Sequence, residues 1–381
     1  MIIKRSIAEN IEKILSGEPK IILLYGPRQA GKTFLLNLIL PKINEQEVVF
    51  LNGDDLRTQE ALSVANLDSL KKIIGSKKFL IIDEAQRISD IGLSLKLLFD
   101  SLAIKIIASG SSSFELANKV SEPLTGRTAI FHLYPIALNE IIFNLPDLSL
   151  QSRLEDFLIF GMYPKVLTTE GADDKQKYLD DLVNGYLYKD ILSFASVRKP
   201  KKVIDLLSLL ALQIGSEVSV AELASHLALS KQAVEKYLDI LEKMFVIYNL
   251  RGFSRNLRKE IYKTSKYYFW DLGLRNALIH NFNSLNLRND KGAMLENFFL
   301  IEKLKQNNNS NKFANFYFWR TYDQKEIDFI EEKDGNLNAY EIKWGEKTVK
   351  PPKDWVANYP NSQFFVVNAD NLMNFFTLYA K

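Results

Sequence analysis

The chain has 381 residues, enough for two or three domains, and its 47% hydrophobic and 25% charged residues are ordinary for a soluble globular protein. The net charge of +3 is too small to indicate nucleic-acid binding by itself, so any basic surface must be local. With no cysteine and only three histidines, the chain excludes disulfides and thiolate catalysis and argues against a zinc or histidine metal site.

The sequence gives no sign of a targeting or membrane segment. No apolar run approaches the roughly 20 residues of a membrane span. The N-terminus carries an amphipathic helical pattern at 6–15 and lacks the continuous apolar core of a signal peptide. We therefore expect a cytoplasmic protein that makes no membrane contact.

The first chemical motif is GPRQAGKT at 26–33, between a buried apolar strand pattern at 21–25 and a helical pattern at 34–40. Its Gly-x4-Gly-Lys-Thr spacing is the P-loop pattern, in which glycines turn backbone N–H groups toward phosphates at a helix start. We expect Lys32 to reach the β- and γ-phosphates and the Thr33 hydroxyl to ligate Mg²⁺. The predicted ATP-binding residues are Gly26, Pro27, Arg28, Gln29, Ala30, Gly31, Lys32 and Thr33.

A Walker B pattern follows. After a short strand at 48–51, the run 78–86 places apolar residues before two acids, Asp83 and Glu84. Asp83 is predicted to hold Mg²⁺, partly through water, opposite Thr33, and Glu84 to orient and polarise the attacking water. The alternative is a buried strand that ends in solvated acids, which the upstream P-loop disfavours.

Two further strands complete the predicted nucleotide-binding core, at 104–108 and 129–133. The first ends in Ser109-Gly110-Ser111, where a polar side chain could touch the γ-phosphate or the lytic water. Ser109 is the candidate for this sensor 1 role and Ser111 the alternative, and a simple Ser/Gly turn explains either residue nearly as well.

The strand pattern predicts an α/β fold with a parallel sheet of order 5-1-4-3-2 and helices on both faces. Nucleotide would then lie at the carboxyl ends of strands 1 and 3. Arg127 precedes strand 5 and would lie at the opposite end of the sheet, where it could serve the ATP of a neighbouring subunit in a homo-oligomer. A plain surface arginine explains the position equally well.

The middle of the chain is helical in pattern. We expect a helical lid on the ATPase core at 146–198, broken by FGMYP at 160–164. Helices are then predicted at 201–214, at 219–227 with a capping box of Ser219 and Glu222, and at 231–244 after an N-capping Ser230. This order has helix-turn-helix spacing.

Extended stretches at 245–250 and 267–270 would make the helix-turn-helix a winged version. The intervening segment holds one acid, Glu260, and six basic residues that form a local footprint for a DNA backbone. The alternative is a winged helix that acts as a protein–protein adaptor with a solvated basic loop. The six predicted DNA contacts are Arg251, Arg255, Arg258, Lys259, Lys263 and Lys266.

The last hundred residues hold a second constellation. A helix at 292–300 carries Glu296 among large apolar residues, and a strand at 316–319 ends at Arg320. Segments 326–330 and 339–344 flank Asp334-Gly335, a strong signal for a two-residue hairpin turn. This hairpin register places Asp328 opposite Glu341.

Alternation places Lys343 on the same face as Glu341, while Ile327 and Phe329 fall on the core face. Two opposed carboxylates repel each other, and Mg²⁺ between them would remove the repulsion. Asp328 and Glu341 with Glu296 as a third acid are therefore predicted metal ligands, and Lys343 would orient water or stabilise the transition state. The alternative is a solvated hairpin face laced by ion pairs, for instance between Glu326 and Lys343.

The chain as a whole resembles prokaryotic AAA+ ATPases that join a P-loop core to an uncharacterised C-terminal half with a winged helix and a PD-(D/E)xK nuclease-like domain. This resemblance implies ATP binding and hydrolysis at Lys32, Thr33, Asp83 and Glu84, and nuclease-type positions at Glu296, Asp328, Glu341 and Lys343. Ile327 stands where the nuclease motif often has proline. The matching segments are GPRQAGKT (26–33), LIIDEAQRI (80–88), SGSS (109–112), LTGR (124–127), FGMYP (160–164), YLYKDIL (186–192), 292–300, WRTYDQKEIDFI (319–330) and YEIKW (340–344).

These observations predict a Mg²⁺-dependent ATPase whose nucleotide state controls a C-terminal half that binds DNA and could cut it. The alternative from another class is an ATP-gated protein-interaction switch with an inactive nuclease-like domain, and a metabolic kinase is disfavoured because no acceptor-substrate site can be inferred. The predicted domains are an AAA+ core at 1–145, a helical lid at 146–198, a winged helix at 199–282 and a PD-(D/E)xK-like domain at 283–381.

Overall fold

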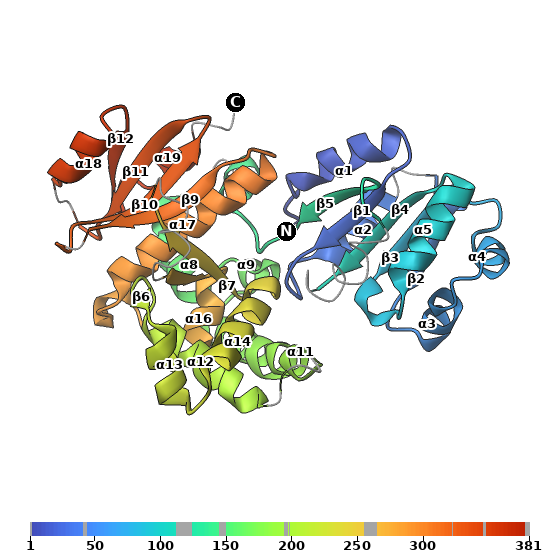
Figure 1. The fold of residues 1–381 in the computed structure, drawn as a ribbon, viewed down its shortest axis with the longest axis horizontal. Helices are drawn as coiled ribbons and strands as arrows, with labels where there is room; N and C mark the ends of the chain where they lie inside the picture. Colours follow the sequence, from blue (N-terminus) through green and yellow to red (C-terminus); the bar gives the residue numbers. More distant parts are fainter. Residues whose placement is uncertain are drawn as a thin grey trace. The chain divides into compact units, whose positions relative to one another are not determined.

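The computed structural model divides into two compact units, shown in Figure 1. The N-terminal unit comprises Ile2–Pro135 with Lys243–Phe245, and the C-terminal unit comprises Ile136–Glu242 with Val246–Lys381. In the part of the chain that the structure describes, no helix is long and apolar enough to cross a membrane. The described residues are 2–40, 44–111, 124–144, 150–193, 197, 199–254, 265–321, 323–345 and 348–377.

The N-terminal unit is built on a parallel five-stranded sheet of order β2-β3-β4-β1-β5. Read from the other edge, this is the predicted order 5-1-4-3-2, so that prediction is confirmed. Strand β1, which lies between β4 and β5, has the sequence IILLY and is buried along its whole length, as expected of a parallel strand covered on both faces. The strands are β1 (Ile21–Tyr25), β2 (Val48–Asn52), β3 (Phe79–Asp83), β4 (Lys105–Gly110) and β5 (Thr128–His132).

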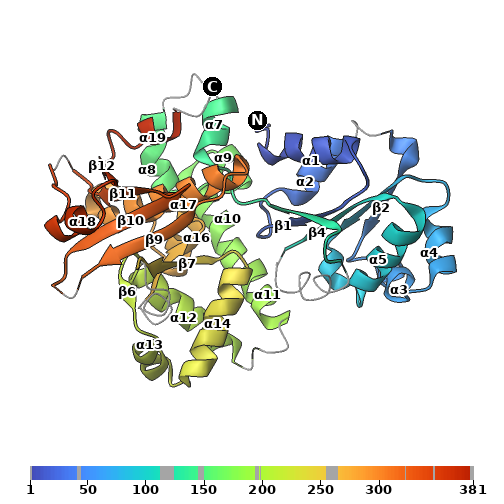
Figure 2. The ribbon, with the colours of Figure 1, turned by 45° about the horizontal axis from the view of Figure 1, so that its top comes forward.

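Helices cover both faces of this sheet. Figure 2 shows α1 and α2 on one face and α5 on the other. Alternate residues of β1, Ile22 and Leu24, pack in one core cluster with apolar side chains of α1 and α2. The elements are α1 (Ile7–Ser16), α2 (Lys32–Ile39), η2 (Glu45–Glu47), α3 (Leu56–Ser63), α4 (Leu67–Ile74), η3 (Ala85–Arg87) and α5 (Ile91–Leu102).

The C-terminal unit contains a seven-stranded sheet of order β12-β11-β10-β9-β7-β8-β6. Strand β7, from the expected wing, pairs in parallel with β9, from the expected nuclease-like domain. The predicted boundary at 282/283 therefore falls between strands that share one sheet. The strands are β6 (Glu217–Val218), β7 (Ile247–Gly252), β8 (Ser265–Phe269), β9 (Asn315–Arg320), β10 (Glu326–Lys333), β11 (Asn336–Ile342) and β12 (Gln363–Val367).

The helices of this unit include the long α17, which packs against the sheet through Phe299 and the Phe329 and Tyr340 rings. The helical elements are α7 (Leu138–Asn144), α8 (Leu150–Phe160), α9 (Pro164–Thr168), α10 (Ala172–Asp181), the π-helical η4 (Leu182–Leu187), α11 (Tyr188–Ser193), α12 (Pro200–Leu212), α13 (Val220–Leu227), α14 (Lys231–Lys243), α16 (Leu272–Leu278), η5 (Leu285–Leu287), α17 (Lys291–Asn309), α18 (Lys353–Asn358) and α19 (Asn374–Thr377).

The two N-capping serines predicted for the helix-turn-helix are confirmed. The Ser219 side chain accepts a hydrogen bond from the Glu222 backbone amide at 3.3 Å, and Ser230 accepts one from the Ala233 amide at 3.2 Å. Ala228 ends α13 in the left-handed conformation, which turns the chain sharply into α14.

The FGMYP segment is fixed by Asp271, the N-cap of α16. One Asp271 oxygen accepts the Leu274 amide at 3.1 Å, and the other accepts the Met162 amide at 2.7 Å. Gly161 has φ +74°, and a Cβ there would lie 2.1 Å from Asp271 Oδ1. The segment expected to be a lid is thus locked to α16 within the C-terminal unit, and its action on the ATPase core stays a prediction.

We predict that Gly161→Ala destabilises the C-terminal unit by about 3 kcal/mol, because the methyl group enters the space of a buried carboxylate at a left-handed position. All four tryptophans, Trp270, Trp319, Trp344 and Trp355, belong to this unit, so their fluorescence during denaturant unfolding measures its stability alone. Gly292→Ala is the control, because a Cβ at that helical glycine meets nothing within 4 Å. Equal unfolding midpoints for the two variants would contradict the close-approach argument.

Candidate functional site

The loop after β1 folds tightly because two glycines stand where side chains do not fit. A Cβ at Gly26 would lie 2.0 Å from the Leu133 carbonyl oxygen. Gly31, with φ +97°, precedes the first residue of α2 in the left-handed conformation. The backbone between them therefore turns directly from the end of a strand into the N-terminus of a helix, where amide donors are unsatisfied.

Lys32 lies inside this loop. Its ammonium donates to the carbonyl oxygens of Gly26 at 2.8 Å and Pro27 at 3.0 Å, and the residue is only 5% exposed. A compact cation is thus held at the centre of the loop by backbone groups. This placement gives the loop a fixed positive charge beside the helix N-terminus, which favours an anionic ligand.

Asp83, at the end of β3, gathers side chains from neighbouring elements. The Thr33 hydroxyl donates to Asp83 Oδ2 at 2.6 Å, and the Ser109 hydroxyl, near the end of β4, donates to Asp83 Oδ1. The order of the sheet explains this arrangement, because β4 lies between β1 and β3. Three oxygen-bearing residues from separate segments therefore meet at the carboxyl edge of the sheet.

Glu84 follows directly in a constrained conformation. Its backbone is left-handed, with φ +51°, which is uncommon for a residue with a side chain. Gln86 donates from Nε2 to Glu84 Oε2 at 2.6 Å and to the Ser111 hydroxyl at 2.9 Å. Ser109 and Ser111 thus make different contacts, since Ser109 binds Asp83 and Ser111 binds the amide that holds Glu84.

The sequence reasoning missed two residues at this site, Gln86 and Arg5. Arg5 is 6% exposed and donates to the Ala30 carbonyl oxygen at 2.8 Å and to the Tyr134 carbonyl oxygen at 2.6 Å. It therefore braces the P-loop against the segment that follows β5. Gln86 lies within the Walker B run at 78–86, although the run gives it no role. For Arg5 there is no signal, because nothing in the sequence spacing indicates that the residues before α1 fold over the P-loop.

Arg127 lies at the amino edge of the sheet, as the strand order requires. It immediately precedes β5, and its carbonyl oxygen accepts the amide of Ile21 at the start of β1. Its guanidinium forms a two-bond ion pair with Asp100, at 2.8 Å and 3.2 Å, and both side chains are about one-third exposed. This position is at the end of β1 opposite the P-loop of the same chain.

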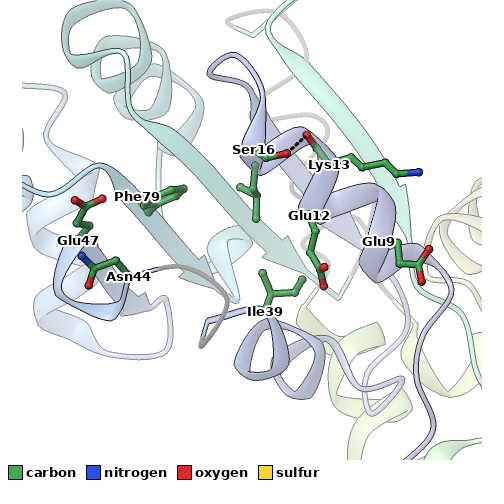
Figure 3. A pocket seen from close by; sticks show the side chains of 9 residues that line it. Glu9, Glu12, Lys13, Ser16, Ile39, Asn44, Glu47 and Phe79 are labelled. Atoms are coloured by element: carbon green, nitrogen blue, oxygen red, sulfur yellow. Dashed lines mark hydrogen bonds between the residues drawn. The ribbon is translucent and has the colours of Figure 1, made fainter.

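A pocket of about 660 Å³ opens at this same amino edge, between α1 and the starts of β2 and β3 (Figure 3). Glu12, Ile39 and Phe79 are among the residues that line it. The P-loop lies at the other end of β1, so the pocket is separate from the predicted phosphate site.

The second constellation is built around the predicted hairpin, whose register is confirmed from Phe329↔Tyr340 to Lys333↔Asn336. Both turn residues, Asp334 and Gly335, have positive φ, as the two-residue turn requires.

One prediction about this hairpin is wrong. Alternation assigns Ile327 and Phe329 to one face, but Ile327 packs in the cluster around Trp355, while Phe329 packs against Phe299 of α17. The register between β9 and β10 shifts between Ile327 and Ile330, which is a β-bulge. The extra residue reverses the alternation beside Asp328, and bulges of this kind re-aim side chains.

Asp328, Glu341 and Lys343 do come together. The Lys343 ammonium lies 2.7 Å from Glu341 Oε1 and 3.8 Å from Asp328 Oδ2, and Asp328 also accepts the Ile342 amide at 2.7 Å. Burial raises the pKa of both carboxyl groups, and repulsion between the two acids raises that of Glu341 further. The pKa of Lys343 is also raised: burial lowers it, but the carboxylates more than offset this.

Glu296 on α17 is held by residues of β8. The Tyr268 hydroxyl donates to Glu296 Oε1 at 2.5 Å, and the Lys266 ammonium lies 3.5 Å from the same oxygen. Burial raises the pKa of Glu296 to about 7, although Lys266 opposes the shift. Among the described residues, no three acidic or histidine side chains are arranged as a metal-binding group.

The structure contradicts one of the six predicted DNA contacts. Lys266 was expected on a basic surface, but the residue is 2% exposed and forms ion pairs with Glu296 and Glu326, so it cannot contact a DNA backbone. The alternative prediction paired Glu326 with Lys343, but in the structure Glu326 pairs with Lys266. Arg251 is exposed. Arg255, Arg258, Lys259 and Lys263 lie outside the described residues.

Comparisons with known proteins identify three successive regions. Residues 18–142 match a family model described as an AAA domain, and 151–288 and 291–372 each match a domain of unknown function. The structure is similar to the Walker-type ATPase PABY2304 of Pyrococcus abyssi, with a TM-score of 0.51 and 18% identity over 73% of this chain and 96% of that one. The P-loop, the strand order and these matches together define a protein with an AAA-type ATPase fold.

Among curated proteins, the chain is 30% identical over 348 residues to the uncharacterized protein Rv2008c of Mycobacterium tuberculosis, covering 90% of this chain and 74% of that protein. It is 26% identical over 342 residues to the uncharacterized protein MJ1544 of Methanocaldococcus jannaschii, covering 85% and 75%. The chain belongs to the same family as Rv2008c.

Proposed function

We propose that the N-terminal unit binds ATP with Mg²⁺ and hydrolyses it. The observation that carries this proposal is the contact between Thr33 and Asp83, whose oxygens suit Mg²⁺, beside a P-loop that holds the Lys32 ammonium. Lys32 would bind phosphate oxygens, and Thr33 and Asp83 would hold the Mg²⁺. When bound, Mg²⁺ would neutralise the charge that develops on the phosphates.

Glu84 would polarise the attacking water in this scheme. Gln86 supports the role because its amide holds the Glu84 carboxylate and so fixes where the base points. Ser109 remains the candidate for the sensor 1 role, because its hydroxyl donates directly to Asp83. Ser111 is linked to Glu84 through the Gln86 side chain.

We expect Lys32→Ala to lose ATP binding and Glu84→Gln to bind ATP but hydrolyse it about 100-fold or more slowly, because a general base of this kind contributes that much. Lys20→Ala is the matched control for Lys32, since it removes the same charge from an exposed position at the amino end of β1. Fluorescent-nucleotide titration and phosphate release measure the two effects. Wild-type turnover in either site variant would refute the assignment.

Arg127 is proposed to act on the nucleotide of a neighbouring subunit. Its place at the amino edge of the sheet supports this role, and its exposed ion pair with Asp100 contributes little stability that assembly would have to overcome. An arginine supplied by a second copy would make hydrolysis depend on a homo-oligomer.

Arg127→Ala is therefore expected to abolish the increase in specific ATPase rate with protein concentration. Phosphate release measured across a dilution series, with oligomeric state followed by sedimentation, tests this. Arg57→Ala, another exposed arginine of the same unit, should keep the concentration dependence. If the Arg127 variant matched the wild-type rate while oligomeric, action between subunits would be excluded.

For the C-terminal unit, we propose a DNA-binding half with a PD-(D/E)xK-like site that nucleotide state controls. The order α12, β6, α13, α14, β7, β8 is that of a winged helix, which supports DNA contact. Asp328, Glu341 and Lys343 supply the carboxylates and the lysine of the nuclease motif within one cluster. The oxygen donors fit Mg²⁺, which would activate a water and stabilise charge on the phosphate.

One observation favours the second candidate, an ATP-gated protein-interaction switch. On the exposed face of α14, Lys231 and Lys236 alternate with Glu235 and Asp239, and Lys266 is buried. A DNA-reading helix ordinarily presents a surplus of positive charge, whereas a mixed face suits contact with another protein.

One assay distinguishes the two candidate functions of the C-terminal unit. In the DNA-binding case we expect cleavage of plasmid DNA with Mg²⁺ or Mn²⁺ to change with ATP and to be abolished in Asp328→Asn, which keeps an acceptor for the Ile342 amide. Asp323→Ala, at an exposed aspartate just before β10, should cut as the wild type does. Absence of both cleavage and DNA retention in a folded wild-type protein favours the interaction switch.

A further inference from the structure

The buried lysine of β8, Lys266, is the feature that neither the nucleotide site nor the nuclease motif explains. Its ammonium forms ion pairs with Glu296 on α17 and with Glu326 on β10, and it lies 5.5 Å from the centre of the Phe318 ring. The side chain is 2% exposed. One residue therefore connects the expected wing to two acids of the nuclease-like cluster.

The surroundings of Glu296 come largely from the segment before residue 283. Tyr268 lies two residues after Lys266 on the same face of β8 and donates to the same carboxylate oxygen. A Cβ on Gly215, in the loop after α12, would lie 3.4 Å from the other oxygen, Glu296 Oε2. Asn297 exchanges two side-chain hydrogen bonds with the Phe269 backbone, at 2.7 and 2.9 Å, which fixes α17 against β8.

The charges around Lys266 explain why it can be buried. Four carboxylates act on one another in this cluster, and two ammonium groups, Lys266 and Lys343, lie among them. Each lysine contacts two of the acids, so neither positive charge is left unpaired away from water. The four acids are Glu296, Glu326, Asp328 and Glu341.

We propose that Lys266 is a built-in cation, which occupies the place between Glu296 and Glu326 and keeps divalent metal ions from using Glu296 as a ligand. The inference rests on the proposed nuclease-like function only in treating these carboxylates as potential metal ligands. A divalent ion and an ammonium repel each other and compete for the same buried oxygen. Lys343, whose side chain is 33% exposed, can yield its carboxylates to an ion by turning into water, whereas Lys266, at 2% exposed, cannot. Metal access to Glu296 then requires β8 to withdraw Lys266.

Replacing the lysine by a neutral side chain removes the positive charge and leaves facing carboxylates in a partly buried setting. Oxygen donors of this kind bind hard divalent cations, and the repulsion between the acids disappears when such a cation is present. Lys266→Met preserves most of the length and the apolar stem of the side chain. Lys266→Arg keeps the charge and is the matched control.

The test is titration of the full-length, nucleotide-free chain with Mn²⁺, with free Mn²⁺ measured by electron paramagnetic resonance. We expect wild type and Lys266→Arg to show no saturable site that depends on Glu296. Lys266→Met should gain one saturable site per chain, with an affinity about tenfold or more above that of any residual Mn²⁺ binding to the wild type, and Glu296→Gln in the same background should remove it. Near-UV circular dichroism establishes that each variant is folded.

A wild-type Mn²⁺ site that disappears in Glu296→Gln overturns the proposal, and so does a folded Lys266→Met variant that gains no site. If Lys266→Met does not fold, the wild-type and Lys266→Arg titrations decide alone, since Glu296-dependent binding in either one contradicts a built-in cation. The DNA-cleavage assay is a separate readout. Failure of cleavage in every variant would count against the nuclease proposal and leave the Mn²⁺ result unaffected.

Discussion

The pairing of buried charges is the constraint on which the C-terminal unit depends. Lys266 joins β8 to α17 and β10, and a second ion pair, Glu302 with Lys305, bonds to the backbone at Leu138 and Ile136. Breaking a buried pair by removing one partner typically costs about 3–5 kcal/mol, because the other charge is then left without compensation. These contacts link segments 30 to 169 residues apart in the sequence, so paired buried charges hold the unit together alongside its apolar core.

A buried carboxylate that needs partners also organises the nucleotide-binding edge of the N-terminal unit. Asp83 is 3% exposed, and its two oxygens each accept a hydroxyl, one from Thr33 and one from Ser109. Because β4 lies between β1 and β3, its end is beside Asp83, and Ser109 joins the Glu84 amide, at 3.1 Å, as a donor to the oxygen that Thr33 does not reach. Strand order thus determines that a serine at the end of β4 shares the carboxylate with the P-loop threonine.

Local sequence patterns predicted the strands and the sheet order of the N-terminal unit, because strand, loop and helix signals there lie within a few residues of one another. Asp334-Gly335 predicted the hairpin register for the same reason. What could not be predicted depends on distant contacts: the pairing of β7 with β9, the path of Arg5 over the P-loop, and the burial of Lys266. The bulge beside Asp328 could not be predicted either. One extra residue inverts the alternation of side chains along β10, and no glycine or proline in the strand indicates it.

The shared sheet gives a physical route between the expected DNA-binding hairpin and the acidic cluster. Lys266 and Tyr268 occupy one face of β8, and both contact Glu296, so the carboxylate follows the strand. Strand β8 pairs with β7, and β7 pairs with β9, whose neighbour β10 carries Glu326 and Asp328. A displacement of β8 would therefore break the contacts of Lys266 and Tyr268 and change the environment of Glu296. The contact between β8 and α17 is therefore local: it consists of the Lys266 ammonium and the Tyr268 hydroxyl at Glu296 and the Asn297 side chain at the Phe269 backbone.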